Sequence, residues 1–197
     1  MDCREPAGNQ VPLRSVADGD HGARPNPAAR RLRRRARRAA GPLSSLVTIG
    51  VYGWRLDAFL EALRSAGVEV VLDVRQRRGV RGSEYAWANA RRLQAALDEA
   101  GVGYEHRPEL APTTELRQLQ YAEDARAGVG RRSRDLLAPE YVRRYTTEIL
   151  DRVELEPPSV PSALLCVERD PEACHRSLIA ERLASDHRVP VDHLRPG

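Results

Sequence analysis

The chain has 197 residues, of which 41% are hydrophobic and only 5% aromatic, so it can bury one core made mainly of aliphatic side chains. No apolar run approaches the roughly 20 residues that span a bilayer, and no signal peptide is evident. The three cysteines are too few for a disulfide scaffold in a chain of this length. We therefore expect a cytoplasmic protein with no membrane partner, and these features leave its oligomeric state open.

The net charge of +4 is unevenly distributed, because residues 1–45 carry ten arginines against four acidic side chains. The remaining residues hold 22 basic and 24 acidic side chains and are close to neutral. Residues 1–45 are also rich in Pro and Gly and have no apolar periodicity, so we expect a disordered basic extension. The arginines between Arg30 and Arg38 either hold a nucleic acid by its phosphates or have no function.

From residue 46 onward, short β-prone runs alternate with segments of helical periodicity. The predicted strands span residues 46–49, 68–74, 103–106, 163–167 and 189–194. The predicted helices span residues 54–66, 89–100, 113–127, 139–153 and 174–185. A polar loop is expected at residues 75–87 and a basic linker at residues 128–138.

This alternation predicts a single three-layer α/β domain over residues 46–197, with a mostly parallel sheet of about five strands and helices on both faces. Open sheets of this kind bind their ligands at the carboxyl ends of the strands. Functional side chains are therefore expected in the loops that follow the strands.

The most reactive side chains follow the fourth predicted strand. Cys166 ends this strand, a polar loop containing Glu168 comes next, and Cys174, His175 and Arg176 begin the following helix. A thiol in the first turn of a helix is favoured as thiolate by the helix dipole. The pattern predicts a nucleophilic or redox thiol, with Cys166 alternatively a small core residue. A metal site on the two cysteines and His175 is the less favoured alternative, because adjacent residues rarely reach one ion, and we assign no metal or cofactor.

Charged side chains also follow the second predicted strand. Asp73 lies within an apolar run, where a carboxylate is costly to bury without a partner, and Arg75 or a loop arginine is the nearest candidate. The pair either orients a ligand at the strand end or forms a structural ion pair. Candidate ligand-binding residues at this edge are Arg75, Arg81, Glu168 and Arg176.

Glu109 follows the third predicted strand and is a candidate general acid or base. A structural role is the simpler interpretation unless the fold brings it to the other clusters. Because the carboxyl ends of parallel strands lie on one edge, we expect Glu109, Asp73 and the Cys–His turn to form a joint site.

From about Val47 to Leu194 the chain resembles the DUF488 family of bacterial and archaeal proteins. The resemblance is carried by Thr48-Ile49-Gly50, by Asp73-Val74-Arg75, by Pro108-Glu109-Leu110 and by the segment from Cys166 to Ser177 with its Cys-x7-Cys-His-Arg pattern. It implies a compact α/β fold but no reaction, since the activity of the family is not established. The candidate site residues that match the family pattern are Asp73, Arg75, Glu109, Cys166, Glu168, Cys174, His175 and Arg176.

The leading hypothesis is an enzyme, or a degraded enzyme, that binds a small anionic or nucleotide-like ligand at the carboxyl edge of the sheet. Cys174 or Cys166 would be the thiol of a transferase or hydrolase, with His175 carrying a proton. Rhodanese-like sulfur or phosphoryl transfer is an alternative by analogy, although the ten-residue step from Cys166 to Arg176 is long for such a phosphate cradle. A further alternative is a non-catalytic nucleic-acid-associated module that uses the arginine-rich extension.

Overall fold

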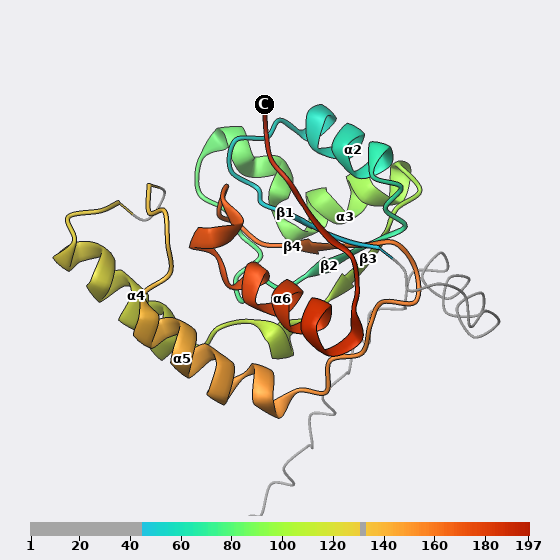
Figure 1. Cartoon of the computed structure of the whole chain (residues 1–197). Coiled ribbons are helices and arrows are strands. Elements are labelled where there is room, and N and C mark those ends of the chain that lie inside the picture. Colours follow the sequence, from blue (N-terminus) through green and yellow to red (C-terminus); the bar gives the residue numbers. More distant parts are fainter. Residues whose placement is uncertain (1–44, 131–132) are drawn as a thin grey trace, which may run out of the picture.

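A computed structural model describes residues 45–130 and 133–197 of the chain (Figure 1). The predicted basic extension, including the run from Arg30 to Arg38, therefore lies outside the described residues apart from Ser45. Within the described residues, five strands form one sheet, and helices pack on both of its faces. No helix in this part of the chain is long and apolar enough to cross a bilayer.

All strands of the sheet are parallel, in the order β3-β2-β4-β1-β5. They are β1 (Leu46–Ile49), β2 (Val70–Asp73), β3 (Gly103–His106), β4 (Ser162–Leu165) and β5 (Val191–Leu194). The predicted α/β fold with a mostly parallel sheet of about five strands is confirmed, and each strand overlaps its predicted range. The central strand β4 pairs with β1 and β2, so that Leu165 lies level with Ile49 on one side and Asp73 on the other.

The helices form a layer on each side of the sheet. Helices α2 (Leu56–Ser65) and α3 (Ala90–Glu99) cover one face, and α6 (His175–His187) packs on β1 and β4 from the other side (Figure 1). Helix α5 (Pro139–Glu148) packs on α6, and α4 (Thr114–Arg126) packs on α5. These last two helices extend the second layer beyond the sheet and provide a wall for the site described below.

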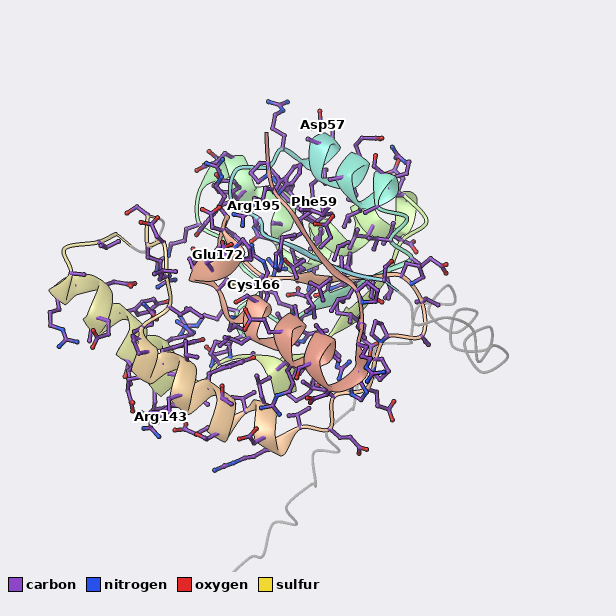
Figure 2. All side chains as sticks on the ribbon, viewed as in Figure 1. Asp57, Phe59, Arg143, Cys166, Glu172 and Arg195 are labelled. Carbon is purple, nitrogen blue, oxygen red and sulfur yellow. The ribbon has the colours of Figure 1, made fainter. Side chains whose placement is uncertain are left out.

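Alternation along the strands divides the core in two. In β4, Ala163 and Leu165 face the core under α2 and α3, which also contains Phe59, whereas Leu164 faces the core under α6 (Figure 2). All four residues of β4 are buried, as expected for a central strand of a parallel sheet covered on both faces. This two-sided burial is the reason why a short, continuous apolar run was enough to predict the strand.

Short 3-10 turns, which the sequence did not predict, follow three of the strands. They comprise Ser83–Ala88 after β2, Pro108–Leu110 after β3 and Pro171–Ala173 after β4. Proline opens the last two, because its fixed φ suits a first turn in which its missing N–H is not needed. The predicted helix at residues 139–153 is shorter than expected, with α5 ending at Glu148.

Candidate active site

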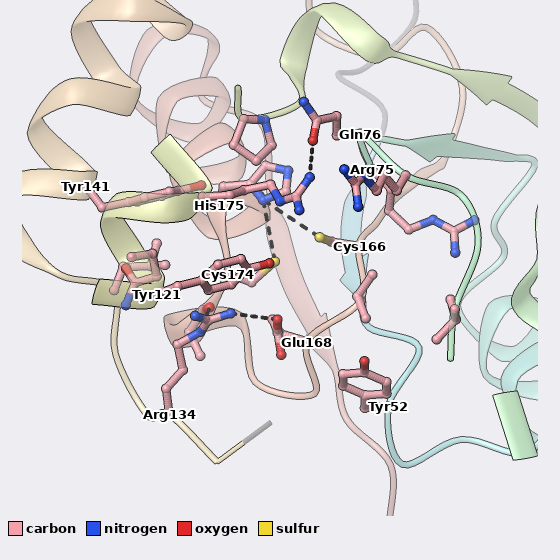
Figure 3. Close-up of a pocket in the computed structure, with 18 of the residues that line it drawn as sticks. Tyr52, Arg75, Gln76, Tyr121, Arg134, Tyr141, Cys166, Glu168, Cys174 and His175 are labelled. Carbon is pink, nitrogen blue, oxygen red and sulfur yellow. Dashed lines mark hydrogen bonds and ion pairs between the residues drawn. The ribbon is translucent and has the colours of Figure 1, made fainter. Parts of the chain in front are cut away.

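A cavity of about 410 Å³ opens at the carboxyl edge of the sheet, where the ends of β2 and β4 meet the start of α6 (Figure 3). Because Leu165 of β4 pairs with Asp73 of β2, the loops that follow these two strands begin at the same level. The remaining wall comes from α4, from the segment before α5 and from α5 itself. All three loops predicted to carry function therefore border the cavity, the one after β3 through Pro112.

Cys166, Cys174 and His175 lie together in the wall of this cavity. Cys166 directly follows β4, and its backbone N–H donates to the carbonyl oxygen of Ile49 at 3.2 Å. Cys174 is the N-cap residue of α6, and His175 is the first residue of that helix. The Nδ1 atom of His175 lies 3.7 Å from the Sγ atom of Cys166 and 3.9 Å from the Sγ atom of Cys174.

The orientation of the His175 ring is fixed by a hydrogen bond at Nε2 and by packing against Tyr145. Its Nε2 atom lies 3.1 Å from the carbonyl oxygen of Val74, which can only accept, so Nε2 carries a proton and donates it. The ring also packs against Tyr145, with 5.5 Å between the ring centroids. In the neutral imidazole, the unprotonated nitrogen is therefore Nδ1, the atom that faces the two sulfur atoms.

The two thiols differ in their ionisation. Burial raises the pKa of Cys174, but the hydrogen bond from Cys166 and the charges of Arg176 and His175 outweigh it and hold this pKa well below its usual value. The hydrogen bond to Cys174, followed by burial, raises the pKa of Cys166 well above its usual value. Of the two sulfur atoms, that of Cys174 is therefore the one favoured as thiolate.

Arg176 shapes the loop after β4 from within the protein. Its side chain is fully buried and donates to the carbonyl oxygens of Glu168, at 2.7 Å, and Arg169, at 2.9 Å. It does not line the cavity, although the sequence suggested it as a ligand-binding residue. The loop thus turns two carbonyl groups inward to Arg176, a different arrangement from a cradle of backbone N–H groups around a phosphate.

The same loop is held against the end of β1 by close packing at Gly50. A Cβ atom at this position would lie 1.9 Å from the carbonyl oxygen of Glu168, so no larger residue fits without moving the loop. The approach is also fixed by hydrogen bonds of 3.0 Å from the N–H groups of Val51 and Tyr52 to the carbonyl oxygen of Val167. These contacts set the position of Glu168 at the cavity.

Glu168 lines the cavity with its carboxylate bound to a buried arginine. Arg134 donates to Glu168 at 2.7 Å (Figure 3) and to Asp124 at 2.6 Å. Burial raises the pKa of Glu168 to about 7, and Arg134 limits this rise by favouring the charged form. The carboxyl group thus changes its charge close to neutral pH.

The cluster at the end of β2 is a closed ion pair. The Nε and Nη2 atoms of Arg75 donate to the two carboxylate oxygens of Asp73 at 2.8 and 2.7 Å, and both side chains are buried. A third donor of Arg75 reaches the carbonyl oxygen of Ala88 at 2.9 Å, and the hydroxyl of Tyr104 donates to Asp73 at 2.6 Å. Of the two predicted alternatives, this geometry corresponds to the structural ion pair. Arg75 lines the cavity, whereas Asp73 does not.

Glu109 does not join the other candidate residues at the cavity. It lies in the 3-10 turn after β3, is 42% exposed and pairs with Arg107. It is outside the cavity lining. The loop after β3 contributes Pro112 to the wall, and helix α4 contributes Arg117 and Tyr121, so the joint site of three strand ends forms without Glu109.

Several lining residues were not singled out from the sequence. Arg134 lies in the segment predicted as a basic linker, and nothing in its local pattern indicates a partner 34 residues away at Glu168. Arg77 belongs to the predicted polar loop together with Arg81, which was singled out and also lines the cavity. The other lining residues that sequence reasoning missed include Tyr52, Gln76, Arg117, Gln120, Tyr121 and Tyr141.

The all-parallel sheet, with a Cys–His cluster and arginines around a cavity at its carboxyl edge, defines an open α/β protein with a candidate thiol-containing active site. Residues 55–183 match the family described as "Domain of unknown function DUF488". This match covers more than half of the chain, so the chain belongs to the family, and the predicted family is confirmed. No curated protein and no solved structure matches the chain.

Proposed function

We propose that this protein is an enzyme of the transferase or hydrolase class, which holds a small anionic substrate in the cavity and acts on it at the cluster of Cys166, Cys174 and His175. The observation that carries the proposal is that this cluster shares one cavity wall with Arg77 and Arg117, neither of which pairs with a carboxylate within the described residues. An excess of positive charge beside reactive side chains is the arrangement expected for an anionic substrate.

Five arginines line the cavity, namely Arg75, Arg77, Arg81, Arg117 and Arg134. The first and the last are each held by buried carboxylates and contribute little net charge. Arg117 instead donates to the neutral side-chain amide of Gln76 (Figure 3). Arg77 is exposed and makes no ion pair within the described residues. The cavity wall therefore retains positive charge that an anion would neutralise by bidentate hydrogen bonds.

The cavity also offers aromatic surface for an organic part of the ligand. Tyr52, Tyr121 and Tyr141 line it, and the guanidinium carbon of Arg117 lies 5.9 Å from the centre of the Tyr121 ring. Pockets that combine apolar walls with a few placed charges bind small organic ligands rather than bare ions. This supports an organic anion, such as a nucleotide-like molecule, as the substrate class.

The reacting end of such a substrate would face the cluster. Cysteine sulfur is the most nucleophilic side-chain atom available to a protein, and the imidazole beside it can exchange a proton or orient a reacting group. These side chains suit a reaction in which the sulfur attacks an electrophilic atom of the substrate next to its anionic group and displaces a leaving group, which His175 can protonate. The proposal therefore assigns binding to the arginines, chiefly Arg77 and Arg117, and reaction to the cluster.

Calorimetric titration of the full chain with inorganic phosphate and with adenosine 5′-monophosphate tests the binding site. We expect binding that weakens at least about 10-fold when Arg77→Gln and Arg117→Gln are combined, because a charge-assisted hydrogen bond contributes about 1.5–3 kcal/mol. Arg143→Gln is the matched control, since Arg143 lies on the exposed surface of α5, paired with Glu140 (Figure 2). Equal affinity of wild type and both variants would overturn the assignment.

Alkylation of the cysteines tests whether anion and cluster share one cavity. Adenosine 5′-monophosphate is expected to slow the reaction of Cys174 with iodoacetamide, measured by mass spectrometry in the full chain. Cys3 serves as an internal control, because it lies far along the chain from the cavity-lining residues and should react at an unchanged rate. Binding without protection of Cys174 would separate the anion site from the cluster and contradict the proposal.

A further inference from the structure

We propose that Cys166, Cys174 and His175 form a three-ligand site for a thiophilic divalent metal ion, with Zn²⁺ as the expected occupant. The two Sγ atoms and the imidazole nitrogen lie within 4.8 Å of one another, and all three residues are buried in the cavity wall. Zinc is borderline-soft and prefers thiolate and imidazole ligands. The sequence prediction assigned no metal, and the inference comes instead from the arrangement of the side chains.

The spacing of the ligand atoms suits tetrahedral coordination. Zn–S bonds of about 2.3 Å and Zn–N bonds of about 2.1 Å, set at the tetrahedral angle, place a sulfur and a nitrogen about 3.6 Å apart. The Nδ1 atom of His175 lies 3.7 Å from the sulfur of Cys166 and 3.9 Å from that of Cys174. An ion would therefore be coordinated with only small movements of these side chains.

Three possible ligand atoms converge in this cluster. With Nε2 of His175 donating to the carbonyl oxygen of Val74, the lone pair of the neutral imidazole is on Nδ1, and the two sulfur atoms lie 3.7 and 3.9 Å from it. A single cation at the centre would satisfy the nitrogen and both sulfur atoms at once (Figure 3).

The second ring nitrogen of His175 makes the kind of hydrogen bond that is common in metal-binding histidines. Histidines that bind metals commonly donate their other ring N–H to a backbone carbonyl or a carboxylate, which fixes the tautomer and the ring orientation. Here Nε2 of His175 donates to the carbonyl oxygen of Val74 at 3.1 Å. This bond leaves Nδ1 free of a proton and directed at the two sulfur atoms.

The backbone explains how two adjacent residues can serve one ion. Cys174 is extended, with φ −142° and ψ 138°, whereas His175 is already in the first turn of α6. The change of conformation between them brings both side chains to the same side of the chain, toward Cys166 (Figure 3). The usual objection to neighbouring ligands therefore does not apply at this turn.

The surrounding charges favour the ligand form of the cysteines. Metal ions bind thiolates, so a site with two cysteines needs positive charge nearby to hold them deprotonated. Arg176 is fully buried and, within the described residues, has backbone carbonyls rather than a carboxylate as its partners. Its charge, one residue along the chain from His175, would offset part of the negative charge of a site with two thiolate ligands.

The fourth coordination position would face the cavity. Within the described residues the cluster offers three ligands, and three protein ligands with an open position are typical of catalytic rather than structural zinc. A bound water or the substrate would occupy that position, beside the arginines of the cavity wall, and in the metal-bound form the two cysteines and His175 would act as ligands instead of nucleophile and proton carrier. The catalytic consequence rests on the proposed function, whereas metal binding itself does not.

Titration of the full chain, first treated with reductant and chelator, tests the site with Co²⁺ as spectroscopic probe. We expect one equivalent to produce thiolate-to-cobalt charge-transfer absorption and intense visible bands of tetrahedral cobalt, both lost when Zn²⁺ is added. Cys166→Ser, Cys174→Ser and His175→Gln should each weaken Zn²⁺ binding at least about 100-fold, since even residues that only orient a metal ligand change affinity by 10–100-fold.

A matched control should bind Co²⁺ as the wild type does. His106→Gln removes a histidine whose Nε2 also contacts a backbone carbonyl, that of Arg75 at 3.0 Å, but which is not part of the cluster. Absence of thiolate-to-cobalt absorption in the reduced wild type, or its loss in a control, would overturn the proposal.

A measurement on the wild type keeps the test valid if a ligand variant fails to fold. One equivalent of Zn²⁺ should protect Cys166 and Cys174, but not Cys3, from alkylation. The outcomes also separate this inference from the proposed function. If Zn²⁺ fails to protect the cysteines but phosphate still binds, only the metal proposal is contradicted. If Zn²⁺ binds but Arg77→Gln and Arg117→Gln leave phosphate binding unchanged, only the anion site is contradicted.

Discussion

Two clusters of polar side chains lie buried at the carboxyl ends of the neighbouring strands β2 and β4, and they differ in how fully their bonding is satisfied. At the end of β2, Asp73 accepts three side-chain hydrogen bonds of 2.6–2.8 Å, two of them from Arg75. At the end of β4, the sulfur atoms of Cys166 and Cys174 share one nitrogen of His175 at 3.7 and 3.9 Å. The first cluster is closed, and the second still has bonding capacity directed at the cavity.

This difference separates a structural from a functional role better than burial does. Both clusters are buried, and both contain groups that sequence reasoning named as candidates. A satisfied ion pair positions the backbone around it and has nothing left to offer a ligand. Buried polar atoms that converge without full hydrogen bonding cost free energy, unless a neighbouring charge or a bound ion offsets that cost. The predictions below test this contrast through the free energy of unfolding.

The largest effect is expected from breaking the closed cluster. Asp73→Asn removes the charge that Arg75 needs, and loss of one partner of a buried ion pair typically costs about 3–5 kcal/mol. The free energy of unfolding, measured by urea denaturation, should fall by that amount. Asp57→Asn is the control, because Asp57 is 81% exposed beside Arg55 and should change stability by less than about 0.5 kcal/mol. A loss at Asp73 as small as at Asp57 would contradict the structural role.

A smaller loss is expected from removing one donor of the same cluster. Tyr104→Phe deletes the hydroxyl that donates to Asp73 at 2.6 Å, and a hydrogen bond to a charged group contributes about 2 kcal/mol. Burial, with the negative charge of Asp73 adding to it, raises the pKa of Tyr104 to about 12. Because the folded-state pKa is above the ordinary value, the contribution is complete below about pH 10 and lost as the pH rises toward 12.

A double-mutant cycle provides the control for Tyr104. In the Asp73→Asn background the hydroxyl no longer meets a carboxylate, so Tyr104→Phe should cost clearly less there than in the wild type. Urea denaturation of the four proteins near neutral pH gives the coupling energy. Equal costs in both backgrounds would show that the hydroxyl acts independently of Asp73.

The contrast also explains which parts of the molecule could be predicted from the sequence. The inner strands β1 and β4 were predictable because their short, mostly apolar runs are buried on both faces, a property of the local pattern. The contribution of α4 and Arg134 to the cavity wall could not be predicted, because it depends on how segments distant in the sequence pack against the loop at Glu168. Glu109 illustrates the opposite case, since a 3-10 turn after β3 directs it to Arg107 instead of the cavity.

The Cys–His turn was recognised from the sequence, but its geometry was not. In the sequence, the adjacency of Cys174 and His175 argued against their binding one ion. The change from extended to helical backbone between them, which brings both side chains together, cannot be read from residue spacing. Arg176 was expected to face a ligand, and it points instead to two carbonyl groups of its own loop. The sequence thus predicted which side chains are candidates for a site, while the backbone decided which of them face the cavity.

The smallest effect on stability is expected from the open cluster. Cys174→Ala, studied in reduced and chelator-treated protein, removes one sulfur atom, its hydrogen bond with Cys166 and its long contact with His175, so the free energy of unfolding should fall by about 1 kcal/mol. The same variant should lose Zn²⁺-dependent stabilisation, which in the wild type grows with metal concentration because the ion binds the folded state alone. A loss of more than about 3 kcal/mol without metal would show that the sulfur atoms already satisfy one another as Asp73 and Arg75 do. The two strand ends would then be equivalent structural clusters, and the cavity would have to derive its chemistry from the arginines and Glu168.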